Sequence, residues 1–121
     1  MTTVFIVDDD PGFRRSLRQL LTYAGFEIIA EAGDITTAER LLRTHNPALA
    51  VVDVMLPDIN GLEGIARLKS LRPTLRVILV SIHHNARLQQ SALAHGAEAF
   101  IPKEQLDLVT VQAWRLPKAI S

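Results

Sequence analysis

The chain has 121 residues, enough for one domain with its own core, and it contains no cysteine, which excludes disulfides and thiolate metal sites. Lys plus Arg and Asp plus Glu number 13 each, so the net charge is zero and no nucleic-acid or anionic-membrane surface is expected in this segment. No apolar run approaches the roughly 18 residues that span a bilayer, and no signal-peptide pattern precedes the first strand, so we expect a cytoplasmic protein.

The first part of the chain predicts a strand, a helix and a second strand. Val4–Val7 is a short apolar run. Asp10 and Pro11 then form a favourable helix start, because Asp suits the N-cap and Pro the first helical position, and Gly25 closes this helix. The second strand is expected at Phe26–Ala30.

The middle of the chain continues the alternation. A capping box at Thr36-Thr37-Ala38-Glu39 predicts the start of the next helix, which stops at Asn46-Pro47. The run Leu49–Val52 is apolar and too short for a core helix, which indicates a strand buried on both faces. A single carboxylate, Asp53, lies near the C-terminal end of this strand, and a Pro/Asp/Asn/Gly turn follows it. Leu62, Ile65, Ala66 and Leu68 then mark a third helix, which Arg72-Pro73 ends.

The next strand repeats this arrangement with a hydroxyl in place of the carboxylate. Arg76–Ile82 is a strand with Ser81 near its C-terminal end. A helix is expected over Asn85–His95, followed by a short fifth strand at Ala99–Ile101. Lys103 lies just beyond that strand.

The tail has two interpretations. Val109, Val111 and Ala113 alternate as they would in a strand, but a β/α alternation needs a covering helix here. We therefore predict a helix over Gln105–Arg115. The last residues, Lys118–Ser121, are expected to be a loose tail or the start of a linker.

Five strands alternating with helices predict an α/β fold with a parallel sheet that is covered on both faces. Because the C-terminal ends of parallel strands share one edge, we expect Asp8, Asp9, Asp53, Ser81 and Lys103 to converge there. Clustered carboxylates repel one another, and Mg²⁺ would remove that penalty. A carboxylate nucleophile, Mg²⁺, a lysine and a serine together suit phosphoryl transfer through an aspartyl phosphate.

Four parts of the sequence carry a resemblance to a known family. They are Val7-Asp8-Asp9-Asp10-Pro11, Val52-Asp53-Val54-Met55-Leu56-Pro57-Asp58-Ile59-Asn60-Gly61, Ser81 and Phe100-Ile101-Pro102-Lys103. Together they resemble the receiver domain of two-component response regulators, most closely those with helix-turn-helix DNA-binding outputs. The resemblance implies one receiver domain over residues 1–121, with a doubly wound, flavodoxin-like sheet of strand order 2-1-3-4-5.

The resemblance also implies a role for each site residue. Asp53 would be the phosphoacceptor that takes a phosphoryl group from a sensor histidine kinase. Asp8 and Asp9 would bind Mg²⁺ together with Asp53 and the backbone carbonyl of Met55. The remaining members of the set would be the switch hydroxyl, the rotating aromatic and the phosphate-pairing lysine, which are Ser81, Phe100 and Lys103.

A signalling switch rather than an enzyme is therefore expected. Phosphorylation would repack the surface formed by the fourth helix, the fifth strand and the last helix. That surface would then bind a partner, an output domain or a second copy in a homodimer. This segment would not bind nucleic acid itself, but the full-length protein could carry a DNA-binding output domain for transcriptional regulation.

Three positions depart from the family pattern. Ile82 stands where a small residue is usual and could crowd access to Asp53. His83-His84 follows, either as solvated loop residues or as groups that tune dephosphorylation. Glu104 stands where many relatives have Pro. Away from these positions, Arg14, Arg15 and Arg18 are interpreted as a solvated helix face.

Two other functions remain open from the residues. The Asp8-x-Asp10 pattern also resembles the nucleophile motif of haloacid-dehalogenase-type phosphatases, but Asp107 is alone where that family has a further acidic pair. A receiver-like scaffold that is never phosphorylated is the second alternative, and Ile82 is the one feature in its favour.

Overall fold

The sheet has five parallel strands in the order β2-β1-β3-β4-β5, as the sequence predicts. The strands are β1 (Thr3–Val7), β2 (Glu27–Ala32), β3 (Leu49–Asp53), β4 (Arg76–Ser81) and β5 (Ala99–Pro102). The computed structural model describes residues 1–117, so the tail expected over Lys118–Ser121 lies outside the described residues.

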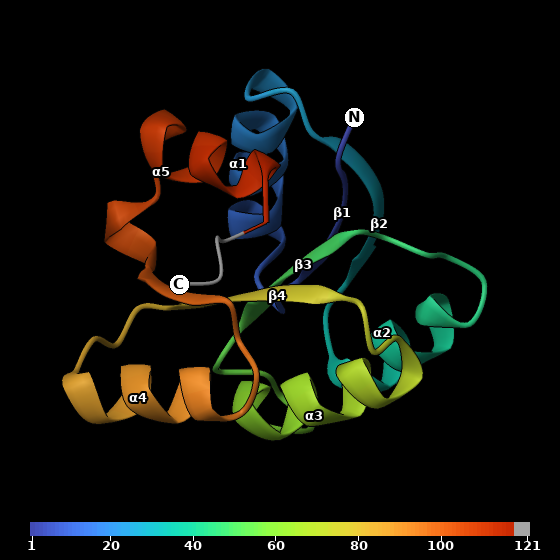
Figure 1. Cartoon of the computed structure of the whole chain (residues 1–121), viewed down its shortest axis with the longest axis vertical. Coiled ribbons are helices and arrows are strands. Elements are labelled where there is room, and N and C mark those ends of the chain that lie inside the picture. Colours follow the sequence, from blue (N-terminus) through green and yellow to red (C-terminus); the bar gives the residue numbers. More distant parts are fainter. Residues whose placement is uncertain (118–121) are drawn as a thin grey trace.

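Helices cover both faces of this sheet. They are α1 (Pro11–Tyr23), α2 (Ile35–Leu42), α3 (Gly61–Leu71), α4 (Ala86–Ala94) and α5 (Leu108–Gln112), with short 3-10 helices at Lys103–Gln105 and Ala113–Arg115. In Figure 1, α1 and α5 lie above the sheet and α2, α3 and α4 lie below it. The result is the three-layered, doubly wound arrangement that alternating strands and helices require.

Alternate residues of each central strand enter different cores. In β1, Val4 and Ile6 pack in the core on the side of α1 and α5, whereas Phe5 and Val7 pack in the core beneath α2, α3 and α4. Every residue of Leu49–Asp53 is buried. Burial on both faces explains why these strands are continuous apolar runs without a polar alternation.

The first two helices begin at aspartate caps. The Asp10 carboxylate accepts a hydrogen bond from the N–H of Gly12 at 2.9 Å, as predicted. At α2, the predicted capping box at Thr36 is wrong, because Asp34 is the N-cap and accepts from the N–H of Thr37 at 2.6 Å. Thr36 lies inside the helix, and its hydroxyl donates instead to Asp58 at 2.8 Å.

The predicted helix over Gln105–Arg115 is interrupted. Only Leu108–Gln112 is α-helical, with a 3-10 turn on each side. Leu106 has an extended backbone (φ −73°, ψ 113°), and Asp107 caps a new helix by accepting from the N–H of Thr110. The cap therefore restarts the helix where the sequence pattern alone indicated a continuous one.

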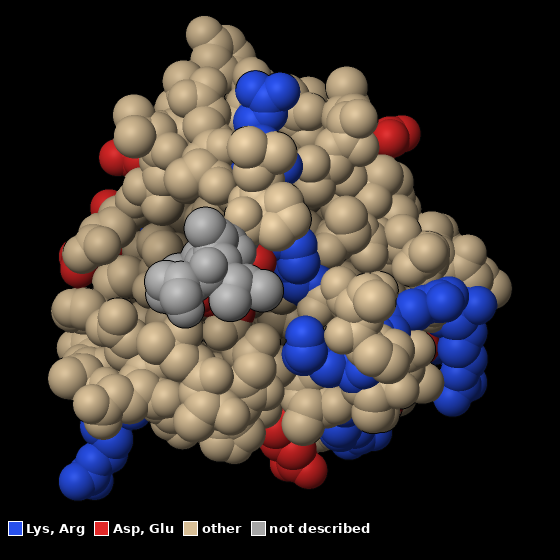
Figure 2. Space-filling view, in the orientation of Figure 1, with Lys and Arg blue, Asp and Glu red and all other residues tan. Residues whose placement is uncertain are grey.

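The surface carries charges of both signs. Two helices carry a basic side chain in their last turn, Arg40 in α2 and Lys69 in α3. These positive charges lie near the negative ends of the helix dipoles. Figure 2 shows Lys and Arg side chains gathered over this part of the molecule. Over residues 1–117, none of the helices combines the length and apolar character needed to cross a membrane.

Candidate functional site

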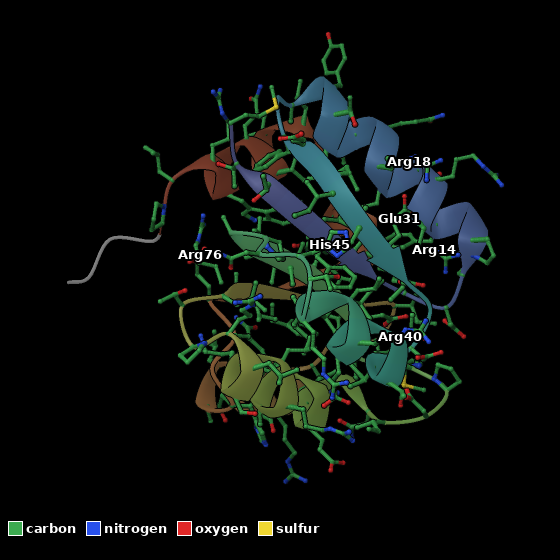
Figure 3. All side chains as sticks on the ribbon, turned by 90° about the vertical axis from the view of Figure 1, so that its right-hand side faces the viewer. Arg14, Arg18, Glu31, Arg40, His45 and Arg76 are labelled. Atoms are coloured by element: carbon green, nitrogen blue, oxygen red, sulfur yellow. The ribbon has the colours of Figure 1, made fainter. Side chains whose placement is uncertain are left out.

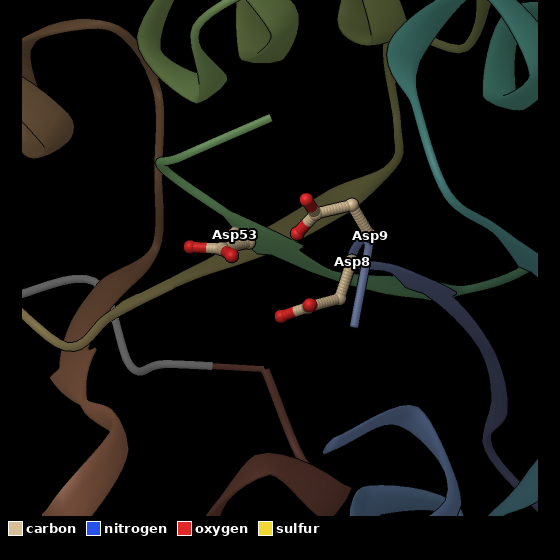
Figure 4. Close-up of side chains that lie close together, drawn as sticks. All are labelled: Asp8, Asp9 and Asp53. Atoms are coloured by element: carbon tan, nitrogen blue, oxygen red, sulfur yellow. The ribbon is translucent and has the colours of Figure 1, made fainter. Parts of the chain in front are cut away.

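Three carboxylates meet at the C-terminal edge of the sheet. Asp8 and Asp9 directly follow β1, and Asp53 is the last residue of β3. Because β1 pairs with β3 in parallel, with Val7 opposite Val52, the residues after these positions lie side by side. One carboxylate oxygen from each residue lies within 4.8 Å of the others. Figure 4 shows the three side chains close together at this edge. Asp8 and Asp53 are buried, whereas Asp9 is exposed.

Lys103 reaches these carboxylates from the far side of β4. Its Nζ lies 2.8 Å from Oδ2 of Asp8 and 3.2 Å from Oδ2 of Asp53. The chain that follows β5 therefore brings one cation to two buried anions, and we call Asp8, Asp9, Asp53 and Lys103 the carboxylate pocket. The sequence predicted this convergence from the shared strand edge alone.

Burial and charge act in opposite directions on the ionisable groups of the carboxylate pocket. Burial raises the pKa of Asp53, the hydrogen bond from the N–H of Met55 lowers it, and the nearby Asp8 raises it again, with a net raised pKa. For Lys103, burial lowers the pKa, but contact with Asp8 and Asp53 outweighs it and the pKa is raised. The ammonium form of Lys103 is thus favoured here.

The donor set of the carboxylate pocket fits a hard divalent cation. Oδ2 of Asp8 is buried and has only the Lys103 ion pair, with no hydrogen-bond partner of acceptable geometry among the described residues. Mg²⁺ in proteins is usually bound by one or two carboxylates, and waters and phosphate oxygens complete its coordination shell. The side-chain chemistry therefore fits the predicted cofactor.

The other predicted site residues occupy β4, β5 and the loops that follow β3 and β4. Ser81 is fully buried at the end of β4, and its Oγ accepts a hydrogen bond from the N–H of His83 at 3.0 Å. Phe100 is buried in the core beneath α2, α3 and α4. Ile82 is 70% exposed and Met55 is 56% exposed, so both side chains lie at the surface around the carboxylate pocket.

Arg14 has a structural role that the sequence did not reveal. Its guanidinium donates to the backbone carbonyl of Asp8, and its Nε lies 3.5 Å from Glu31 on β2. Arg18 also pairs with Glu31, at 2.6 Å, as seen beside α1 in Figure 3. The Arg14 side chain is 22% exposed, so its interpretation as part of a solvated face is wrong, whereas Arg18, at 44%, and Arg15 are exposed as predicted.

Gly61 allows α3 to start directly against β3. A Cβ atom at this position would lie 2.5 Å from the backbone oxygen of Asp53, closer than any real contact. The N–H of Gly61 donates to the carbonyl of Val54 at 2.8 Å and closes the loop between them.

Asp10 does not join the carboxylate pocket, because its carboxylate caps α1, so the phosphatase-like Asp8-x-Asp10 pattern does not form a site here.

Comparisons with known proteins agree on one family. The family model of the response regulator receiver domain matches residues 4–112. A Pseudomonas aeruginosa protein with a provisional transcriptional-regulator name is 38% identical over 105 residues, covering 87% of this chain and 51% of the relative. The probable transcriptional regulatory protein NarL of Mycobacterium tuberculosis is 31% identical over 111 residues, covering 91% of this chain and 51% of the relative. The chain thus spans about half the length of these relatives.

Solved structures show the same fold. A LuxR-family two-component response regulator from Aurantimonas sp. SI85-9A1 has a TM-score of 0.86 and 29% identity, covering 94% of this chain and 83% of that one. A chain of the CheX–CheY–BeF₃–Mg²⁺ complex from Borrelia burgdorferi has a TM-score of 0.85 and 30% identity, covering 93% of this chain and 84% of that one.

Proposed function

Because the chain belongs to the response regulator receiver domain family, we propose that it is a phosphorylation-controlled signalling switch in which Asp53 accepts the phosphoryl group. A sensor histidine kinase is the proposed donor, and residues 1–121 are proposed to form a single receiver domain. The observation that carries this proposal is the carboxylate pocket, in which Asp53 lies beside two further acidic residues and within 3.2 Å of Lys103.

The chemistry of the proposed step follows from these groups. An oxygen of Asp53 attacks the phosphorus of a phosphohistidine, the P–N bond breaks as the O–P bond forms, and the imidazole leaves with the electron pair and takes up a proton. Bound Mg²⁺, held by Asp8, Asp9, Asp53 and the Met55 carbonyl, would supply charge neutralisation. Lys103 pairs with an oxygen of the new phosphoryl group.

The switch would then act through β4, β5 and the adjoining helices. In the phosphorylated state Ser81 donates its hydroxyl to the phosphoryl group and Phe100, which is already 6% exposed here, adjusts its packing, so that the face formed by α4, β5 and α5 repacks. To invert a population of about one per cent, phosphorylation must favour that state by several kcal/mol. Ile82 and His83, beside the carboxylate pocket, would tune how fast the phosphoryl group enters and is lost.

The output is proposed from the relatives. The two relatives with transcriptional-regulator names described above are matched over about half of their length. A DNA-binding output domain in the full-length protein, controlled by the α4, β5 and α5 face or by a homodimer through that face, is therefore part of the proposal. Direct nucleic-acid binding by this segment is not part of the proposal.

Intact mass spectrometry after incubation with acetyl phosphate and Mg²⁺ tests the phosphoacceptor. We expect the wild-type protein to gain one phosphoryl group that hydroxylamine removes, as an acyl phosphate requires. Asp53→Asn should abolish the gain, because an amide oxygen is not a competent nucleophile here.

The matched control is Asp34→Asn, which changes another carboxylate while keeping a side chain that can cap α2. It should be labelled like the wild type. Labelling that persists in Asp53→Asn would refute the acceptor assignment, and an unlabelled wild type would favour the scaffold that is never phosphorylated.

A further inference from the structure

We propose that Phe13 positions the Lys103 ammonium in the carboxylate pocket through a contact between the charge and the face of its ring. Nζ of Lys103 lies 4.0 Å from the centre of the Phe13 ring. Phe13 comes from the first turn of α1 and Lys103 follows β5, so the contact joins two ends of the chain across the site. The functional part of this inference rests on the proposed phosphoacceptor role of Asp53.

The ammonium of Lys103 is held from three sides. An ammonium group has three N–H donors, and Asp8 and Asp53 take the two directions in which Nζ lies 2.8 and 3.2 Å from a carboxylate oxygen. The Phe13 ring is a third partner. Because the Lys103 side chain is only 14% exposed, the negative ring face replaces much of the water that would otherwise solvate the charge.

The contact with the Phe13 ring would matter for the position of the Lys103 ammonium because there is empty space beside the ring. A groove of about 200 Å³ opens along α1 next to Lys103. It is lined by Phe13, Ser16, Leu17, Leu20, Lys103 and Leu106. The flexible four-carbon stem of Lys103 could swing into this groove, and the attraction of the ring keeps the ammonium over the carboxylates instead.

A purely apolar role for Phe13 makes a different prediction. The ring also packs, half-buried, against the core on the side of α1 and α5. If packing were its only role, the electron density of the ring face would be irrelevant. Fluorination of the ring separates the two roles, because it weakens the ring quadrupole while nearly preserving shape.

The first test replaces Phe13 with 4-fluoro-, 3,5-difluoro- and 3,4,5-trifluorophenylalanine by site-specific incorporation. We expect the rate of phosphorylation by acetyl phosphate to fall stepwise, by about fivefold for the trifluoro ring. The matched control is the same series at Phe26, which is buried in the same core and has no cation over its ring among residues 1–117. That series should leave the rate unchanged. Equal rates across the Phe13 series would overturn the proposal.

The second test observes the contact without phosphorylation. In the metal-free protein, the ring current of Phe13 should shift the proton resonances next to Nζ of Lys103 upfield, and Phe13→Leu should abolish the shift while Phe13→Tyr keeps it. Absence of the shift in the wild type would overturn the proposal. A shift in a wild-type protein that takes up no phosphoryl group would refute the proposed function, and with it the functional role of Phe13, while establishing the contact.

Discussion

Asp58 ties the loop after β3 to the first turn of α2. Its carboxylate accepts hydrogen bonds from the N–H of Ile35 at 3.2 Å, the N–H of Thr36 at 3.0 Å and the Thr36 hydroxyl at 2.8 Å. Burial alone would raise the pKa of Asp58, but these bonds outweigh it and lower the pKa to about 2. A residue that the sequence assigned to a turn therefore also joins two elements.

The variant Asp58→Asn tests how the stabilisation by the Asp58 carboxylate depends on pH. Because the folded pKa lies below the unfolded value, ionised Asp58 stabilises the fold above about pH 4, and this stabilisation is lost as the pH falls towards 2. The side chain is exposed, so screening limits the contribution to about 1 kcal/mol at pH 7. Urea unfolding at several pH values should show Asp58→Asn less stable than the wild type at pH 7, with the gap closing at low pH.

The control for this series is Glu104→Gln, which removes an exposed carboxylate from the 3-10 helix after β5. Its stability should follow that of the wild type at each pH. If the difference in stability between Asp58→Asn and the wild type were the same at pH 7 and pH 3, ionisation of Asp58 would not be its cause.

At the scale of elements, α5 is held by very few side chains. Val111 is fully buried and Trp114, in the 3-10 turn that follows, is 5% exposed, whereas Val109 is 76% exposed. Trp114 is therefore a core residue, packed in the core on the side of α1. Val109, two residues after the Asp107 cap, lies on the exposed face of this short helix.

Trp114→Ala should destabilise the protein far more than Val109→Ala, although both positions belong to the same short segment. Removing a buried indole costs about 3–5 kcal/mol, whereas an exposed position changes stability by about 0.5 kcal/mol or less. Chemical denaturation gives both values, and amide exchange should show α5 opening first in Trp114→Ala. Similar losses for the two variants would mean that α5 does not depend on Trp114.

Elements with strong local signals could be predicted, and long-range partnerships could not. The parallel sheet, the Asp10 cap and the burial of β3 follow from apolar runs, turn residues and the βα alternation, whereas the strand order followed from the family resemblance. The Asp34 cap and the break before α5 depend on which nearby polar side chain captures a backbone N–H, which spacing alone does not decide. Arg14 and Phe13 could not be assigned to the site because their partners, Glu31 on β2 and Lys103 after β5, lie far from them in the sequence.

For the whole molecule, we predict that the carboxylate pocket makes the stability of the fold depend on divalent cations. Three acidic residues gather in this pocket and two of them pair with Lys103, so a cation that binds the folded state should stabilise it by mass action. We expect Mg²⁺ at a hundredfold excess over its Kd to raise stability by about 2.7 kcal/mol, measured as a rise in Tm. Asp9→Asn should reduce this rise, while Asp34→Asn should not.

Asp9 is the informative position for this experiment. It is the exposed member of the three, and the ion pairs of Lys103 involve Asp8 and Asp53 instead. Its substitution therefore changes the cation site with little effect on the buried pairs. A Tm that is independent of Mg²⁺ in the wild type would contradict the predicted cation site.

The segment from Val54 to Gly61 is fastened at several points along its length. The N–H of Gly61 bonds to the Val54 carbonyl, no side chain fits at Gly61, and Asp58 grips the start of α2. An inserted or deleted residue here would displace Asp58 and Asp53 together. Protein engineers who graft peptides or sensors into this scaffold should accordingly leave the stretch behind β3 at its native length.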